Sequence, residues 1–141
     1  MTISTAESCT GGMVATAITS IPGASKIFQY GFVTYSEEAK GRILQIDPVI
    51  LKCGAVSPEV AEAMAAGARE ISRADFAVAV TGFAGPEGGT PLAPVGTGFI
   101  AIAGGKVSEL LRKDFTGDRQ AIREKLSEVA LKMALEYVTR L

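Results

Sequence analysis

At 141 residues, 48% of them hydrophobic, the chain is expected to fold as one domain over residues 1–141. Its net charge of −1 and the absence of a Lys/Arg block argue against a nucleic-acid partner, and no apolar run approaches the ~20 residues that span a membrane. The chain has no histidine, which excludes Ser-His-Asp and Cys-His catalytic sets and makes a metal centre of the usual zinc type unexpected.

The N-terminal part begins with a predicted strand over residues 2–7 and a predicted helix from Thr10 to about Ile21. The turn between them reads Ala6-Glu7-Ser8-Cys9-Thr10-Gly11-Gly12. At such a turn, backbone N–H groups and the positive end of the helix dipole face one place, which suits Ser8 to act as a nucleophile beside an oxyanion site. The alternative is that Ser8 and Thr10 cap the helix while the two glycines permit a tight turn.

Residues 27–35 are rich in β-branched and aromatic side chains and predict a second strand. Because a helix connects the two strands, they are expected to be parallel, with Ser8 and Tyr35 at the sheet edge where ligands of α/β proteins bind. Ser36 begins a short helix, and Lys40 lies one turn into it. A cation there opposes the helix dipole, so Lys40 is either a functional residue or a solvated surface lysine.

The central part predicts a second helix and a buried strand. Residues 45–56 are expected to be mostly loop, and Ser57-Pro58-Glu59 begins a helix that runs to about Arg73. Residues 75–81 are almost all apolar and predict a strand covered on both faces. The glycine-rich stretch 82–91 lacks the ending of a Walker A loop. Its glycines either let backbone N–H groups approach a phosphate or carboxylate, or form a flexible connection.

The C-terminal part predicts a hairpin and a long helix. Residues 95–103 and 106–115 form the expected hairpin, closed by a primed turn at Gly104-Gly105. Gly117-Asp118 then opens a helix to about Arg140. These elements predict the α/β fold class, as a three-layer α/β/α arrangement with a mixed sheet of about five strands.

Four further side chains carry possible chemistry. Arg119 and Arg123 lie one turn apart on one face of the last helix, either as ligands for an anion or, more commonly, as solvated arginines. Cys9 and Cys53 are expected to be reduced thiols of a cytoplasmic protein, since no secretory leader precedes the first strand.

Six segments, in order along nearly the whole chain, resemble the motifs of one family. They are Ala6-Glu7-Ser8-Cys9-Thr10-Gly11-Gly12, Tyr35-Ser36-x-x-Ala39-Lys40, Gly54-Ala55-Val56-Ser57, Thr81-Gly82-x-Ala84-Gly85-Pro86-x-Gly88-Gly89-Thr90, Pro94-Val95-Gly96-Thr97 and Phe115-x-Gly117-x-Arg119. Together they resemble the CinA C-terminal domain family, the nicotinamide-nucleotide amidohydrolases. Members of that family usually have a helix before the first strand, whereas this chain begins almost at that strand. The pyrophosphatase-like domain that some members carry upstream has no counterpart in these residues.

The resemblance implies hydrolysis of nicotinamide mononucleotide to nicotinic acid mononucleotide and ammonia, in pyridine-nucleotide recycling and without a cofactor. It implies the catalytic set Ser8, Tyr35 and Lys40. Ser8 would attack the carboxamide carbon, and Lys40 or Tyr35, hydrogen-bonded to Ser8, would take its proton. A lysine base must be neutral, which requires burial to lower its pKa by about 3 units for it to be half neutral at pH 7.

The resemblance also implies a substrate-binding set. Its members are Cys9, Thr10, Gly11, Gly12, Thr81, Gly82, Gly85, Gly89, Thr90 and Arg119. Backbone N–H groups of residues 9–11 would hold the oxyanion, and either the glycine-rich loop or Arg119 would hold the substrate phosphate.

Two other functions stay open at this point. One is a non-catalytic nucleotide- or protein-binding module linked to competence or DNA damage, and the other is an amidase with Cys9 as its nucleophile. The sequence also leaves open whether the chain forms a homo-oligomer.

Overall fold

The computed structural model describes residues 1–141 and contains one mixed sheet of five strands. The strands are β1 (Ile3–Glu7), β2 (Phe28–Val33), β3 (Phe76–Gly82), β4 (Thr97–Ala103) and β5 (Ser108–Asp114). Their order across the sheet is β2-β1-β3-β4-β5. The strand β1 is parallel to β2 and β3, whereas β4 and β5 are antiparallel to their neighbours. The predicted parallel pairing of the first two strands is therefore confirmed, as is the C-terminal hairpin.

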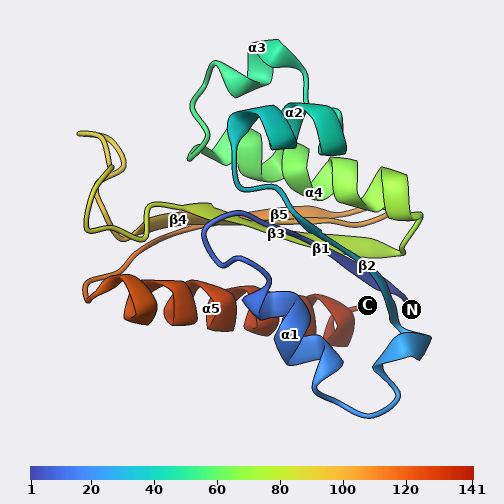
Figure 1. Ribbon diagram of the computed structural model, residues 1–141. Helices are drawn as coiled ribbons and strands as arrows, with labels where there is room; N and C mark the ends of the chain where they lie inside the picture. Colours follow the sequence, from blue (N-terminus) through green and yellow to red (C-terminus); the bar gives the residue numbers. More distant parts are fainter.

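Helices cover both faces of the sheet (Figure 1). The helices α1 (Met13–Thr19) and α5 (Arg119–Thr139) lie on one face, while α2 (Glu37–Leu44), α3 (Pro48–Leu51) and α4 (Pro58–Ser72) lie on the other. The single-turn 3-10 helix η1 (Ala24–Lys26) precedes β2. The predicted three-layer α/β/α arrangement is confirmed. None of the helices combines the length and apolarity that crossing a bilayer requires.

The two faces of the central strand β3 carry side chains of different size. Its larger side chains, including Phe76 and Val80, pack in the core on the α5 side, whereas Ala77 and Ala79 belong to the core on the α4 side. The buried face of α4 is likewise rich in alanine. Because the side chains are small both on this face of β3 and on the buried face of α4, the helix can approach the sheet closely and leave a close-packed interior.

The helix starts follow the predicted capping residues. Ser36 accepts a hydrogen bond from Ala39 N, Ser57 accepts one from Val60 N, and Asp118 accepts one from Ala121 N. Each side chain thereby pairs an N–H group that the first helical turn leaves free. The starts of α2, α4 and α5 are therefore set by local sequence.

Residues 45–56 are mostly loop, as predicted, but the four-residue helix α3 lies within them. The helix begins with Asp47, whose carboxylate accepts from Val49 N, followed by Pro48 at the first helical position. This is the same cap-plus-proline signal that begins α4. The first helix is also shorter than predicted: it starts at Met13, after Gly12 at φ 107°, and Ile21 lies outside it and is exposed.

The hairpin turn is not the primed turn that Gly104-Gly105 predicts. Ala103 pairs with Ser108, and neither glycine has a positive φ. The Gly104 N–H donates to Val107 O across a four-residue connection. A Cβ at Gly104 would collide with the hydroxyl of Tyr137 on α5. Glycine at this position is therefore required by the close approach of a helix rather than by the turn.

Candidate active site

A cleft of about 260 Å³ opens at the carboxyl ends of β1 and β3. Its lining includes Ser8, Tyr35 and Lys40 of the predicted catalytic set. Of the predicted substrate-binding set, it includes Cys9, Thr81, Gly82, Gly85 and Arg119. Five lining residues were not in the predicted set: Ala55, Val56, Phe83, Ala84 and Glu87. The first two belong to a segment that carries the family resemblance, but apolar residues in a loop give no signal of their own for substrate contact.

Lys40 reaches Ser8 from the other side of the cleft. Its Nζ lies 2.8 Å from Ser8 Oγ, 2.8 Å from the backbone oxygen of Thr34 and 3.3 Å from that of Tyr35. The residue is only 1% exposed, so Lys40 is not a solvated surface lysine. Burial lowers the pKa of Lys40 from its ordinary value of 10.5 to about 8, against smaller opposing effects of Cys9 and Glu37. This supplies most of the shift that a lysine base requires.

The three oxygen atoms around Nζ match both protonation states of Lys40. As an ammonium group it donates to all three. As a neutral amine it has two N–H groups and one lone pair. If Thr34 and Tyr35 backbone oxygens accept the two N–H groups, the lone pair faces Ser8 Oγ and can take its proton.

The Tyr35 hydroxyl does not bond Ser8, contrary to one of the two predicted base assignments. It accepts a hydrogen bond from Arg119 Nη2 at 2.7 Å, and the side chain is 58% exposed. Tyr35 meets Ser8 only through its backbone oxygen, 3.5 Å from Ser8 Oγ. The structure thus brings Ser8 and Lys40 together directly and places the Tyr35 ring at the mouth of the cleft.

Glu7, which sequence reasoning missed, anchors the turn that carries Ser8. Its buried carboxylate accepts from Thr10 Oγ1 (2.7 Å), Val14 N (2.9 Å) and Ala15 N (3.1 Å). The negative charge therefore lies at the N-terminus of α1, where the helix dipole favours it. Glu7, rather than Ser8 or Thr10, accepts hydrogen bonds from the free N–H groups in the first turn of the helix. The side chain of Thr10 is consequently turned inward and does not line the cleft.

The backbone of this turn leaves the Thr10 N–H unpaired within the protein. Gly11 N donates to Ser8 O at 3.0 Å, so this N–H, which was among the predicted oxyanion donors, is already engaged. The Cys9 N–H faces its own thiol, and the Thr10 N–H donates to no acceptor in the protein. Gly11 and Gly12, at φ 57° and 107°, shape the turn and do not line the cleft.

Cys9 is a poor candidate for a nucleophile. Its side chain is 5% exposed and belongs to the core on the α5 side of the sheet. Burial raises the pKa of the Cys9 thiol from 9.0 to about 11, although a hydrogen bond from its own backbone N–H and the charges of Lys40 and Arg123 act in the other direction. The reactive form of cysteine is the thiolate, and this environment disfavours it.

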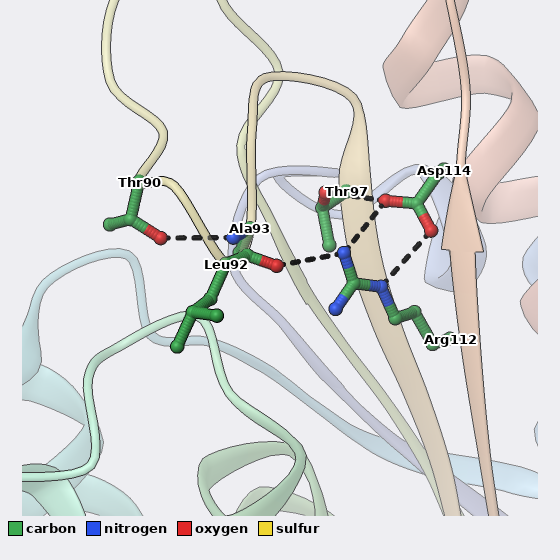
Figure 2. Close-up of polar contacts among 6 residues, drawn as sticks. All are labelled: Thr90, Leu92, Ala93, Thr97, Arg112 and Asp114. Atoms are coloured by element: carbon green, nitrogen blue, oxygen red, sulfur yellow. Dashed lines mark hydrogen bonds and ion pairs between the residues drawn. The ribbon is translucent and has the colours of Figure 1, made fainter.

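A hydrogen bond from β5 holds the segment that follows the glycine-rich loop. Figure 2 shows Arg112 reaching from β5 to the Leu92 backbone oxygen (2.8 Å) and to both oxygens of Asp114 (3.0 and 3.1 Å). Asp114 also accepts from Thr97 Oγ1 at 2.7 Å, and these hydrogen bonds, the one from Arg112 first, lower the pKa of its carboxyl. The guanidinium lies 5.6 Å from the centre of the Phe99 ring.

Two members of the predicted binding set in this loop have structural roles instead. The Thr90 hydroxyl accepts from Ala93 N at 3.0 Å (Figure 2), and a Cβ at Gly89 would lie 2.8 Å from Val95 N. Neither Gly89 nor Thr90 lines the cleft. Thr81, which does, donates from Oγ1 to Ala55 O at 2.7 Å and so ties β3 to the loop before α4.

The two arginines near the start of α5 occupy different places. Arg119 lines the cleft, where it also donates to Gly85 O at 2.7 Å. Arg123 lies behind the turn and donates to the Cys9 backbone oxygen at 2.9 Å. No group of three or more His, Cys, Asp or Glu side chains is placed to hold a metal ion.

Comparison with known proteins gives close relatives. A CinA-like protein of Citrifermentans bemidjiense is 49% identical over 139 residues, which are 98% of this chain and 34% of that protein. The chain thus spans about a third of the length of that curated relative. A Pseudomonas putida protein named nicotinamide-nucleotide amidohydrolase PncC is 49% identical over 138 residues, 97% of this chain and 86% of that protein.

Solved structures agree with the sequence relatives. The crystal structure of a CinA superfamily protein from Escherichia coli superposes with a TM-score of 0.93 at 36% identity, covering 97% of this chain and 80% of that one. The competence/damage inducible protein CihA of Agrobacterium tumefaciens gives 0.89 at 42% identity, covering 96% and 84%. The profile of the CinA C-terminal domain matches residues 1–138. The chain therefore belongs to the CinA C-terminal domain family.

Proposed function

We propose that this protein hydrolyses the carboxamide of nicotinamide mononucleotide, with Ser8 as nucleophile and Lys40 as general base. The observation that carries the proposal is the buried contact of 2.8 Å between Lys40 Nζ and Ser8 Oγ inside the cleft. Similarity to the Pseudomonas putida amidohydrolase supports the substrate class. The lowered pKa of Lys40 supports its role, because a base must be able to lose its proton near neutral pH.

The reaction proceeds in two halves. Ser8 Oγ attacks the carboxamide carbon while its proton passes to Lys40 Nζ, and the N–H group of Thr10 stabilises the oxyanion. Lys40 then gives the proton to the departing nitrogen, so that ammonia leaves and a nicotinoyl ester of Ser8 remains. In the second half, water loses a proton to Lys40 and attacks the ester carbon. Return of that proton to Ser8 Oγ releases nicotinic acid mononucleotide.

Arg119 and Tyr35 have binding roles in this proposal. Arg119 is held by Gly85 O and the Tyr35 hydroxyl, both at 2.7 Å, and presents its guanidinium to the cleft. A fixed guanidinium suits a phosphate, with which it forms paired hydrogen bonds. The glycine-rich loop also lines the cleft, with five of its residues, but it offers no cationic side chain and carries the acidic Glu87. We therefore assign the substrate phosphate to Arg119, with the Tyr35 ring beside the cationic pyridinium.

Release of ammonia from nicotinamide mononucleotide by the purified protein tests the proposed function. Mass spectrometry of enzyme stopped during turnover is expected to show a nicotinoyl group on Ser8. Binding of the nucleotide with no ammonia release would instead favour the non-catalytic binding module.

The pH profile is expected to follow the ionisation of Lys40. Its pKa is lowered to about 8, so about one molecule in ten holds a neutral Lys40 at pH 7. We expect kcat/KM to rise about tenfold per pH unit below pH 8 and to level off above it. Initial rates between pH 6 and about 10, at substrate concentrations far below KM, measure this profile. A profile that is flat across pH 8 would contradict the assignment of Lys40 as base.

Replacement of Arg119 by methionine is expected to weaken binding of the nucleotide far more than it slows chemistry. Loss of a charge-assisted pair with phosphate should raise KM about tenfold or more, while kcat changes less. Nicotinamide riboside, which lacks the phosphate, serves as the matched substrate. Its kcat/KM should be nearly the same in both proteins, and an equal loss for both substrates would argue against a phosphate role.

A further inference from the structure

The helix α5 holds the backbone of the nucleophile turn from behind. Arg123 donates from Nε to the Cys9 oxygen at 2.9 Å and from Nη2 to the Thr10 oxygen at 3.5 Å. Its remaining terminal nitrogen donates to Gln120 Oε1 at 2.9 Å, which fixes the guanidinium plane. A Cβ at Gly11 would lie 3.3 Å from Nη2, so the guanidinium packs directly on the turn. Arg123 does not line the cleft and has no direct contact to offer a substrate.

These contacts determine where the N–H groups of the turn point. The C=O and N–H of a trans peptide point in opposite directions. The Cys9 oxygen points to Arg123 on the α5 side of the sheet. The N–H of the same peptide unit, which belongs to Thr10, therefore points away from Arg123. The Cys9 N–H belongs to the same peptide unit as Ser8 O. The hydrogen bond from Gly11 N to Ser8 O therefore fixes the direction of the Cys9 N–H in the same way.

The unpaired state of the Thr10 N–H is a second, independent observation. Thr10 is fully buried, yet its N–H donates to no acceptor in the protein, whereas the Cys9 N–H faces its own thiol. Almost all buried backbone N–H groups in proteins are paired, so an unpaired donor two residues after the nucleophile indicates a place for an anionic oxygen.

We propose that Arg123 is a positioning residue for the reaction. By holding the Cys9–Thr10 peptide it directs the Thr10 N–H at the oxygen that becomes negative when Ser8 attacks a carbonyl carbon. Its positive charge behind the peptide also strengthens that N–H as a donor. The inference rests on the proposed role of Ser8, but not on the identity of the amide that is hydrolysed.

Arg123→Met tests the role of the guanidinium, because methionine keeps much of the side chain's apolar volume and has no donor. A misdirected oxyanion donor should lower kcat about 50-fold and leave KM within about threefold. Arg123→Lys retains one charged donor and is expected to recover part of kcat. Millimolar guanidinium ion added to Arg123→Met should do the same. Lys132→Met, which removes a charge from an exposed position of the same helix, should leave both constants unchanged.

A second substrate separates this inference from the proposed function. Acylation of Ser8 by p-nitrophenyl acetate also passes through an oxyanion, and nitrophenol release in excess of the Ser8→Ala background reports it. A slower release from Arg123→Met supports the inference even if the wild type leaves nicotinamide mononucleotide intact, an outcome that refutes only the substrate. Ser8-dependent release from neither substrate overturns both proposals.

Two results would overturn the positioning role alone. One is an Arg123→Met protein whose kcat and acylation rate stay within about threefold of the wild type. The other is a lower rate that is accompanied by weaker product binding and a lower melting temperature, with no recovery in Arg123→Lys or with guanidinium ion. That pattern would mean that Arg123 only supports the fold of the turn.

Discussion

Ser8→Ala is expected to lower kcat for ammonia release by about 10⁴-fold or more, because the variant has no oxygen that can form the acyl intermediate. Cys9→Ala, the matched variant one residue along, should keep kcat within about an order of magnitude, since its buried thiol has no role in bond making. Both variants should fold. Ser8→Ala leaves Lys40 with one acceptor fewer, a loss of about 1 kcal/mol.

Ammonia release and thermal unfolding, measured on both variants beside the wild type, give the result. Nucleotide binding to Ser8→Ala, followed by calorimetry, shows whether the cleft survives the substitution. Near wild-type turnover in Ser8→Ala would refute Ser8 as nucleophile. Complete loss of turnover in a folded Cys9→Ala protein would reopen the thiol mechanism.

Lys40→Met is the second substitution with a large expected effect. Methionine fills a similar volume but cannot accept a proton, so kcat should fall about 10³-fold. Lys40→Arg should be about as inactive, because a guanidinium stays protonated at every usable pH. Lys52→Met, at an exposed position in the loop before α4, is the matched control and should behave as the wild type. Retention of kcat in either Lys40 variant would exclude Lys40 as the base.

Lys40→Met is also expected to change how the free energy of unfolding depends on pH. The pKa of Lys40 is about 8 in the folded protein against an ordinary value of 10.5, so between these pH values the unfolded chain binds more protons than the folded one. The Lys40 contribution to folding stability therefore rises with pH across this window, by about 3 kcal/mol in total, while the raised pKa of Cys9 lowers stability above pH 9 in any variant that keeps the thiol. Urea unfolding of the wild type and of Lys40→Met is measured at pH 7.5 and about 10.5, and the change in stability between these pH values should be more favourable in the wild type by about 3 kcal/mol.

The sequence predicted the positions of Ser8 and Lys40 at one sheet edge because that placement depends on strand direction alone. Parallel pairing of β1 with β2 puts both strand ends on the same side, and the Ser36 cap fixes where α2 begins. Hydrophobic periodicity and capping residues are local properties, so the five strands and most helix starts could be read from them.

What could not be predicted depends on where individual side chains turn in three dimensions. Glu7 and Arg123 hold the nucleophile turn from within the layers, yet both are charged residues that a sequence pattern places at the surface. The Tyr35 hydroxyl lies beside Arg119, which is 84 positions away in the chain. Only the close-packed arrangement of α1, α5 and the sheet decides such partners.

The position of β2 at the edge of the sheet gives the two halves of the Ser8–Lys40 pair unequal local stability. β1 is flanked by strands on both sides and is buried throughout, whereas β2 pairs on one side only and is largely exposed. Lys40 follows β2 through residues 34–36, so a sub-global opening that frays this edge would withdraw the base while β1, β3 and β4 stay folded. Loss of the contact between Ser8 and Lys40 on warming would then precede the cooperative melting of the core.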